Sequence, residues 1–237
     1  MTTLVLIPGL ISDRAVWQPV ADAVEGRMNV HHANLSDGTS ITGMAEMLLV
    51  ETSGPVIAVG HSMGGRIALE MARIAPGRVK GLVLANTGHG PKKDGEEIKR
   101  QAMIDLGHRG MDGLADQWLP PMLDPARLSD AALMAGLKAM VLRSDAGMHE
   151  RQIRALMGRP NATAYLKDIS CPVLLIAARQ DGWSPIAQHQ EIAAAVPDAE
   201  LVIIENAGHF APVERPAEVV SAITSWLGRK QGDHYAG

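Results

Sequence analysis

The stretch PVIAVGHSMGGRIALEMA, residues 55–72, joins two different patterns within one segment. The β-branched apolar run at its start predicts a buried strand over Val56–Val59, and the apolar spacing after Ser62 predicts a helix. Ser62 stands at the junction, between Gly60 and Gly64. Either this serine is a nucleophile held at a strained turn, or the glycines mark a tight strand-to-helix turn that carries a spectator hydroxyl.

Strands and helices alternate on both sides of this stretch. Apolar runs predict strands over residues 4–7, 29–33, 56–59, 79–85, 173–178 and 200–204. Helical spacing predicts helices over residues 14–26, 41–52, 62–75, 185–195 and 216–226. Such alternation is typical of right-handed crossovers between parallel strands, with helices on both faces. We therefore predict an α/β protein with a mostly parallel sheet of about six strands.

The alternation breaks in the middle of the chain. Residues 88–166 are helical in pattern throughout, rich in Met, Leu and Ala, and punctuated by Pro120-Pro121 and Pro125. A second set of strands resumes after this block. We interpret the chain as one domain with a helical insertion: residues 1–87 and 167–237 form the α/β core, and residues 88–166 form the insertion.

The composition excludes several classes of protein. Of 237 residues, 46% are hydrophobic and 20% are charged, as in ordinary globular domains. A net charge of -4 argues against nucleic acid or an anionic membrane as the partner. The opening residues MTTLVLIPGL lack the positive region of a signal peptide and are interpreted as a strand. Cys171 is the single cysteine, which fits a reducing compartment, so we expect a soluble, cytoplasmic protein.

Polar residues follow the ends of the predicted strands, where open parallel sheets bind their ligands. Ser62 follows the third strand in the chain, Asp181 the fifth and His209 the last. These three residues are therefore expected at one edge of the sheet. Their order along the chain is the one found with a nucleophile elbow on such a sheet.

These residue types fit nucleophilic catalysis. A serine hydroxyl is a weak nucleophile and needs a neutral imidazole to take its proton. The imidazole needs a carboxylate on its other nitrogen to fix its tautomer and stabilise its charged form. The backbone N–H groups of Met63, after the serine, and of Leu10, after the first strand, are placed to stabilise an oxyanion.

Four motifs together resemble the α/β-hydrolase superfamily, and the resemblance covers nearly all of the chain. They are LVLIPGL at 4–10, GHSMGG at 60–65, ARQDGWSP at 178–185 and AGHFAPVERP at 207–216. The resemblance implies a helical lid over residues 88–166. It also implies the site residues: Ser62 as nucleophile, Asp181 as acid, His209 as base, and Leu10 and Met63 as oxyanion donors.

Within this superfamily the chain looks similar to small-lid carboxylesterases, 3-oxoadipate enol-lactonases and the menaquinone-pathway synthase. Two departures stand out. Pro8 occupies a position where many relatives have histidine. The chain also begins at the strand that precedes the oxyanion loop, so the two leading strands of the full fold are not expected.

For several other residues the sequence leaves two interpretations open. His61 either packs beside the serine or touches substrate, and Trp183 and Trp118 either line the substrate pocket or belong to the core. Asp94 is an alternative acid, but its setting in PKKDGEE favours a solvated helix start. The histidines lack metal-ligand spacing, and Gly64-Gly65 lacks the lysine of a phosphate-binding loop. No metal and no cofactor are therefore expected.

The residues and the resemblance together predict a serine hydrolase that cleaves a carboxylic ester or lactone of a small apolar substrate. Two alternatives stay open: a C–C bond hydrolase or lyase that uses the same three residues, and a non-catalytic receptor for a small molecule. The expected partner is the small-molecule substrate, not nucleic acid or a membrane. A homodimer also stays open, because an apolar lid face and a dimer face look alike in sequence.

Overall fold

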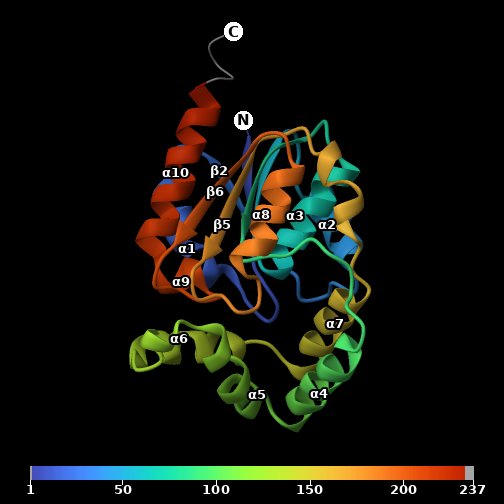
Figure 1. Ribbon diagram of the computed structural model, residues 1–237, viewed down its shortest axis with the longest axis vertical. Coiled ribbons are helices and arrows are strands. Elements are labelled where there is room, and N and C mark those ends of the chain that lie inside the picture. Colours follow the sequence, from blue (N-terminus) through green and yellow to red (C-terminus); the bar gives the residue numbers. More distant parts are fainter. Residues whose placement is uncertain (1, 233–237) are drawn as a thin grey trace.

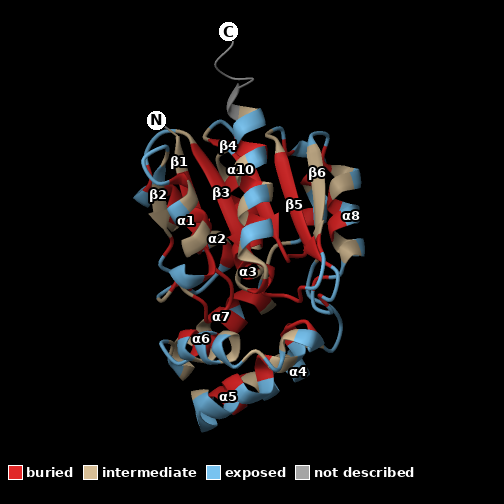
Figure 2. Cartoon of the chain, turned by 90° about the vertical axis from the view of Figure 1, so that its left-hand side faces the viewer, coloured by how far each residue is buried: buried red, intermediate tan, exposed pale blue. Residues whose placement is uncertain are grey.

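Six parallel strands form a single sheet at the centre of the molecule. The computed structural model describes residues 2–232, with only the backbone of 231 and 232. Within that range the strand order is β2-β1-β3-β4-β5-β6 (Figure 2). The strands are β1 (Thr3–Ile7), β2 (Asn29–His32), β3 (Val56–His61), β4 (Val79–Ala85), β5 (Val173–Ala178) and β6 (Ala199–Ile204). The predicted α/β fold with about six parallel strands is confirmed.

Two of the central strands, β3 and β5, are buried along their whole length. Every residue of β3 and β5 is buried, as expected of parallel strands covered on both faces, while the edge strands β2 and β6 are mostly half-buried (Figure 2). Pairing continues one residue past the end of β3, because the N–H of Ser62 donates to the carbonyl of Ala85 at 2.9 Å. The residue after β3 is thereby fixed to the end of β4.

Helices cover both faces of the sheet. Helices α1 and α10 lie on one face, and α2, α3 and α8 on the other (Figure 1). No helix in the described range is long and apolar enough to cross a lipid bilayer. The helices of the two layers are α1 (Gln18–Val24), α2 (Ile41–Glu51), α3 (Met63–Ile74), α8 (Ile186–Ala195), α9 (Ala211–Glu214) and α10 (Pro216–Gly232).

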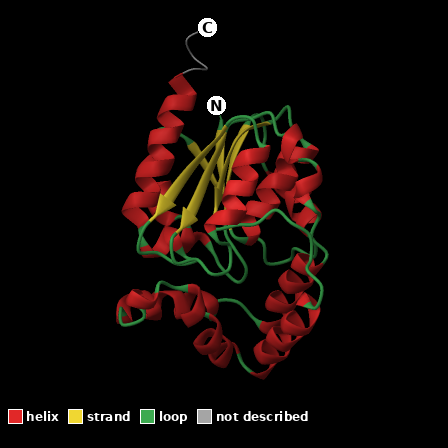
Figure 3. Ribbon diagram, in the orientation of Figure 1, coloured by secondary structure: helices red, strands yellow, loops and turns green. Residues whose placement is uncertain are grey.

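A separate group of helices connects β4 to β5. It lies across the carboxyl ends of the strands, towards which the strand arrows point (Figures 1 and 3). Asp130 and Asp145 cap the third and fourth of these helices by accepting from the N–H groups of Leu133 and Met148. The group consists of α4 (Glu96–Arg109), α5 (Met111–Trp118), α6 (Ala131–Val141) and α7 (Ala146–Met157).

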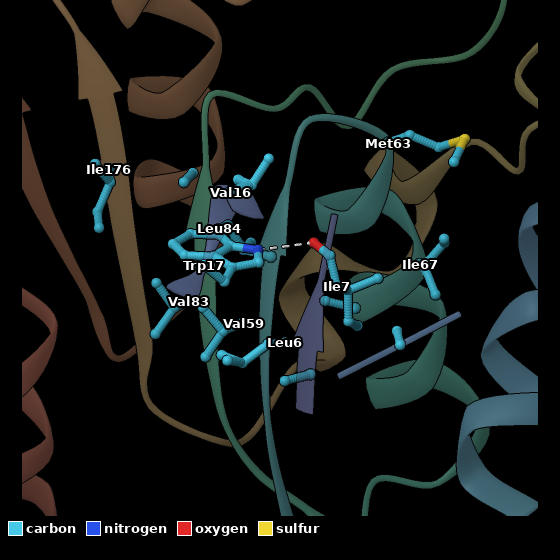
Figure 4. Packing of buried hydrophobic residues seen from close by; sticks show 14 of the residues in the cluster. Leu6, Ile7, Val16, Trp17, Val59, Met63, Ile67, Val83, Leu84 and Ile176 are labelled. Atoms are coloured by element: carbon cyan, nitrogen blue, oxygen red, sulfur yellow. Dashed lines mark hydrogen bonds between the residues drawn. The ribbon is translucent and has the colours of Figure 1, made fainter. Parts of the chain in front are cut away.

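The segment after β1 is irregular rather than one helix over 14–26. Arg14–Val16 forms a short 3-10 turn that Asp13 caps, and α1 starts afterwards at Gln18. Between the two, the Trp17 indole N–H donates to the carbonyl of Ile7 at 3.0 Å (Figure 4). This bond fixes the last residue of β1, and with it the start of the loop that carries Leu10.

Candidate active site

Ser62 sits at a strained turn between β3 and α3. Its φ of 55° and ψ of -113° lie outside the conformations that non-glycine residues favour. The flanking glycines allow the close approach: a Cβ on Gly60 would lie 2.3 Å from the carbonyl oxygen of Gly64, and one on Gly64 would lie 2.2 Å from that of Ile7. The turn therefore accepts no side chain at either glycine.

Ser62, His209 and Asp181 lie in hydrogen-bond contact. His209 Nε2 is 2.8 Å from Ser62 Oγ, and His209 Nδ1 is 2.9 Å from Asp181 Oδ2. A carboxylate can only accept, so Nδ1 carries the proton and Nε2 is free to accept from the serine hydroxyl. The three residues come from three strand ends, as the sequence predicted.

Asp181 is buried and held by several donors. Its Oδ1 accepts from the N–H groups of Trp183 at 2.8 Å and Ser184 at 2.9 Å, and its Oδ2 accepts from Asn86 Nδ2 at 3.0 Å. Burial alone would raise the pKa of Asp181, but His209 and these donors outweigh it and hold the pKa below its usual value. The alternative acid, Asp94, is an exposed residue at the rim of the pocket.

Two residues after β4 support the site and were missed in the sequence. Asn86 bonds Asp181, as described, and also donates to the carbonyl of Gly208 at 3.2 Å. Thr87 Oγ1 donates to the carbonyl of Ser62 at 2.6 Å, and the Thr87 N–H donates to His189 Nε2 at 3.2 Å. Residues that bind ligands follow the carboxyl ends of parallel strands, and this rule located the loops of Ser62, Asp181 and His209. Because it applies equally to the end of β4, it also pointed to Asn86 and Thr87.

His61 packs beneath the loop after β6 that carries His209, which we call the histidine loop. Its Nε2–H donates to the carbonyl of His209 at 2.8 Å, and its ring centroid is 5.2 Å from that of Phe210. Burial, and to a smaller extent His209, lowers the pKa of His61 to about 3, so the ring is neutral at pH 7. Only 1% of the residue is exposed, although it borders the pocket.

Glu214 joins the histidine loop to the helical segment. Its carboxylate accepts from the N–H of Gly208 and from the N–H of Asp124, each at 2.9 Å. The His209 N–H donates in addition to the carbonyl of Met122 at 2.6 Å. The loop before α9 is therefore fixed from both sides, by the sheet and by the segment between α5 and α6.

A pocket of about 690 Å³ opens above Ser62 and His209. Leu10 and Met63 border it, and in the described part of the chain neither of their backbone N–H groups donates to a protein acceptor. Trp118 and Trp183 also border it: Trp118 is 4% exposed and meets Phe210 edge-on, whereas Trp183 is 43% exposed and lies 6.4 Å from the His209 ring.

The opposite wall of the pocket comes from the helices between β4 and β5. Apolar side chains on this wall include Met103, Ile153 and Leu156. His149 lies among them, fully buried, and neither of its ring nitrogens has a hydrogen-bond partner among the described residues. Burial, followed by the charges of His108 and Arg100, lowers the pKa of His149 to about 4, so it is a neutral imidazole.

Comparisons with known proteins agree with this architecture. The sequence model of the alpha/beta hydrolase family matches residues 4–222, and the chain belongs to that family. A pimeloyl-[acyl-carrier protein] methyl ester esterase of Chromobacterium violaceum is 26% identical over 239 residues, which cover 94% of this chain and 93% of the relative.

Two solved structures have the same fold. An esterase from Thermogutta terrifontis, solved with malate bound, superposes with a TM-score of 0.89 at 23% identity, covering 97% of this chain and 90% of that one. The enol-lactonase of Burkholderia xenovorans LB400 superposes with a TM-score of 0.83 at 20% identity, covering 96% and 91%. At these identities the likeness concerns the fold.

Proposed function

We propose that this protein is a serine hydrolase that cleaves a carboxylic ester or lactone of a small substrate through an acyl-enzyme on Ser62. The observation that carries the proposal is the contact of His209 Nε2 with Ser62 Oγ at 2.8 Å, beside the buried Asp181 at 2.9 Å from Nδ1. Membership of the alpha/beta hydrolase family and a relative named as a methyl ester esterase support it.

The proposed reaction has two halves. In the first, Ser62 Oγ attacks the carbonyl carbon while His209 Nε2 takes the hydroxyl proton, and Asp181 stabilises the imidazolium. The oxyanion is held by the N–H groups of Leu10 and Met63. His209 then protonates the leaving alkoxide, which departs and leaves the acyl group on the serine.

In the second half, water replaces the alcohol. His209 takes a proton from water, the hydroxide attacks the acyl carbon, and Ser62 regains its proton as the acid leaves. For a lactone, the alkoxide and the acid belong to one product, a hydroxy acid. No cofactor enters either half.

In this proposal residues 88–166 act as the lid, and the pocket wall formed by the lid selects the substrate. The apolar side chains of Trp118, Met122 and Leu156 line the pocket and fit an apolar acyl portion. Trp183 and His61 belong to the other wall of the pocket, which the loops at the strand ends form and which we call the strand-end wall. We assign Trp183 to the pocket mouth, because it is 43% exposed, and His61 to the support of the histidine loop.

The test combines turnover and labelling. Wild-type protein should hydrolyse 4-nitrophenyl acetate and butyrate, and Ser62→Ala should lower kcat by roughly 10⁴-fold or more. A fluorophosphonate probe should modify Ser62, as mapped by mass spectrometry, and should fail to modify Ser62→Ala. A label on another residue, or a Ser62→Ala variant with wild-type turnover, would refute the proposal.

A further inference from the structure

Arg66 is a cation on the pocket wall without an acidic partner. It lies in the first turn of α3, four residues after Ser62, and both residues border the same pocket. Its Nη1 donates to the carbonyl of Gly90 at 2.9 Å, and among the described residues no carboxylate pairs with it. Its Nη2 lies against Gly88, where a Cβ would come within 3.1 Å of it.

None of the carboxylates described around the pocket forms an ion pair with this guanidinium. Glu96 is shared by two other arginines, Arg100 at 3.1 Å and Arg159 at 2.7 Å, and Glu191 is an exposed carboxylate 3.4 Å from His89. The chain as a whole carries a net charge of -4, yet cations outnumber carboxylates around the pocket. The described lining contains Arg66, Lys93, Lys99, Arg100 and Arg159 against Asp94, Glu96 and Glu191.

Arg66 keeps its charge in this setting. Burial, followed by the like charge of Arg159, lowers the pKa of Arg66 to about 9; the charge of Glu96 opposes this shift only in part, and the group is still protonated at pH 7. A desolvated cation without a counter-charge destabilises the folded protein. The energetic cost of holding such a cation at the wall of a substrate pocket is offset when an anionic ligand binds beside it.

The hydrogen-bonding geometry favours a carboxylate. A guanidinium presents its donors in a planar fork that matches the two oxygens of a carboxylate. One donor of Arg66 is engaged by Gly90, which leaves the donors on its Nη2 for a ligand. The apolar side chains that line the same pocket suit the hydrocarbon that would separate this carboxylate from the reacting carbonyl.

We infer that the substrate carries a carboxylate that Arg66 binds, in addition to the ester or lactone carbonyl that Ser62 attacks. The inference rests on the proposed function and narrows its substrate class to half-esters of dicarboxylic acids and to lactones with an acid side chain. Hydrolysis of a half-ester by this site releases the alcohol and a dicarboxylate, with water supplying the hydroxyl of the new acid group.

The test compares substrates that differ only in charge. The monomethyl esters of succinic, glutaric and adipic acid are each paired with the same ester bearing a terminal amide in place of the acid. For the best length, wild-type protein should prefer the acid by roughly 10-fold to 100-fold in kcat/KM, the range expected of a charged hydrogen-bonded pair. Arg66→Gln should reduce the acid-to-amide ratio to near one, and Arg66→Lys should restore part of it.

Two matched variants separate a direct contact from a general electrostatic effect. Arg73→Gln removes a cation from the same helix outside the pocket, where Arg73 pairs with Glu70 at 2.9 Å, and should keep the wild-type ratio. Lys99→Gln removes an exposed cation from the pocket rim and should change the ratio by less than about threefold. If Lys99→Gln lowers the acid-to-amide ratio as much as Arg66→Gln does, the inference is overturned.

A binding experiment needs no turnover. In calorimetric titrations, adipate should bind wild-type protein at least roughly tenfold more tightly than Arg66→Gln. Equal affinities, or equal rates for acid and amide in the wild type, overturn the carboxylate inference and leave the ester hydrolase proposal standing. If the wild-type protein shows no ester turnover and no labelling of Ser62, yet binds adipate through Arg66, the result contradicts the hydrolase proposal instead.

Discussion

The two walls of the pocket hold their polar side chains in different ways. On the strand-end wall, Asp181, Thr87 and His61 each bond a group from a different strand end, over short distances and away from solvent. On the helical wall, two arginines share Glu96, and the buried His149 has no partner among the described residues. The sheet thus fixes the strand-end geometry, whereas the helical wall holds polar groups that a ligand can complete.

In the proposed hydrolase, the strand-end wall carries out the reaction and the helical wall takes part in selecting the substrate. Groups positioned by strand ends move only if the sheet moves, which suits a site that requires distances accurate to fractions of an ångström. Groups on the helical wall depend on ion pairs near solvent, and these are individually weak and easily exchanged. Changes to the strand-end groups should therefore lower kcat, whereas changes on the helical wall, or to Arg66 on helix α3, should alter substrate choice or stability.

The largest expected effect is that of Asp181→Asn. An amide can donate to His209 Nδ1 and so favours the tautomer in which Nε2 carries the proton and cannot accept from Ser62. We expect kcat for 4-nitrophenyl butyrate to fall by roughly 10⁴-fold with KM little changed. A matching thermal unfolding curve would serve as the folding control. Activity within tenfold of wild type would remove Asp181 from the proposed mechanism.

A smaller effect is expected of Thr87→Val. The change removes the hydroxyl that donates to the carbonyl of Ser62 and leaves that oxygen without its 2.6 Å partner. We expect the free energy of unfolding to fall by about 1–3 kcal/mol and kcat to fall about tenfold, as the strained turn relaxes. Thr87→Ser keeps the hydroxyl and should retain most activity. Equal losses in the two variants would show that the methyl group, not the hydrogen bond, matters.

The smallest effect concerns Glu96 on the helical wall. Burial would raise its pKa, but Arg159, the Lys93 N–H and Arg100 lower it to about 2, from a usual value of 4.5. A lowered pKa stabilises the folded protein above pH 4.5, and this contribution disappears as the pH falls towards 2. Glu96→Gln should therefore reduce the acid-induced loss of stability by about 1–2 kcal/mol, once solvent screening is allowed for.

Urea unfolding at pH 6 and pH 3 measures this prediction. The drop in unfolding free energy between the two values should be smaller in Glu96→Gln than in the wild type. Glu25→Gln, at an exposed position that forms no ion pair among the described residues, should behave like the wild type. Identical drops in the wild type and Glu96→Gln would mean that the helical wall does not depend on this carboxylate.

The sheet and the contacts among Ser62, His209 and Asp181 could be predicted from sequence because local patterns encode them. Most strands are short apolar runs, two of which end at Pro8 and Gly60, and a parallel sheet brings the ends of all its strands to one edge. The contact of Ser62 with His209 across 147 positions of the chain then follows from topology. Gly60 and Gly64 carried the further information that the turn is tight.

The rest of the pocket could not be predicted, because it depends on packing between helices whose orientation has no local signal. Nothing in the sequence near Arg66 indicates that Gly88 leaves room for its guanidinium, or that Glu96 is already engaged by Arg159. The predicted helix over 14–26 failed for a local reason: Asp13 caps a 3-10 turn, and α1 begins only at Gln18.

The exposure of Trp183 gives the protein a built-in optical reporter. The other three tryptophans, Trp17, Trp118 and Trp226, are between 0% and 4% exposed, whereas Trp183 is 43% exposed and 6.4 Å from the His209 ring. A dissolved quencher such as acrylamide therefore reaches a single indole, at the mouth of the pocket. Protection of that fluorescence by a bound ligand would allow the affinity of any candidate substrate analogue to be titrated without a label.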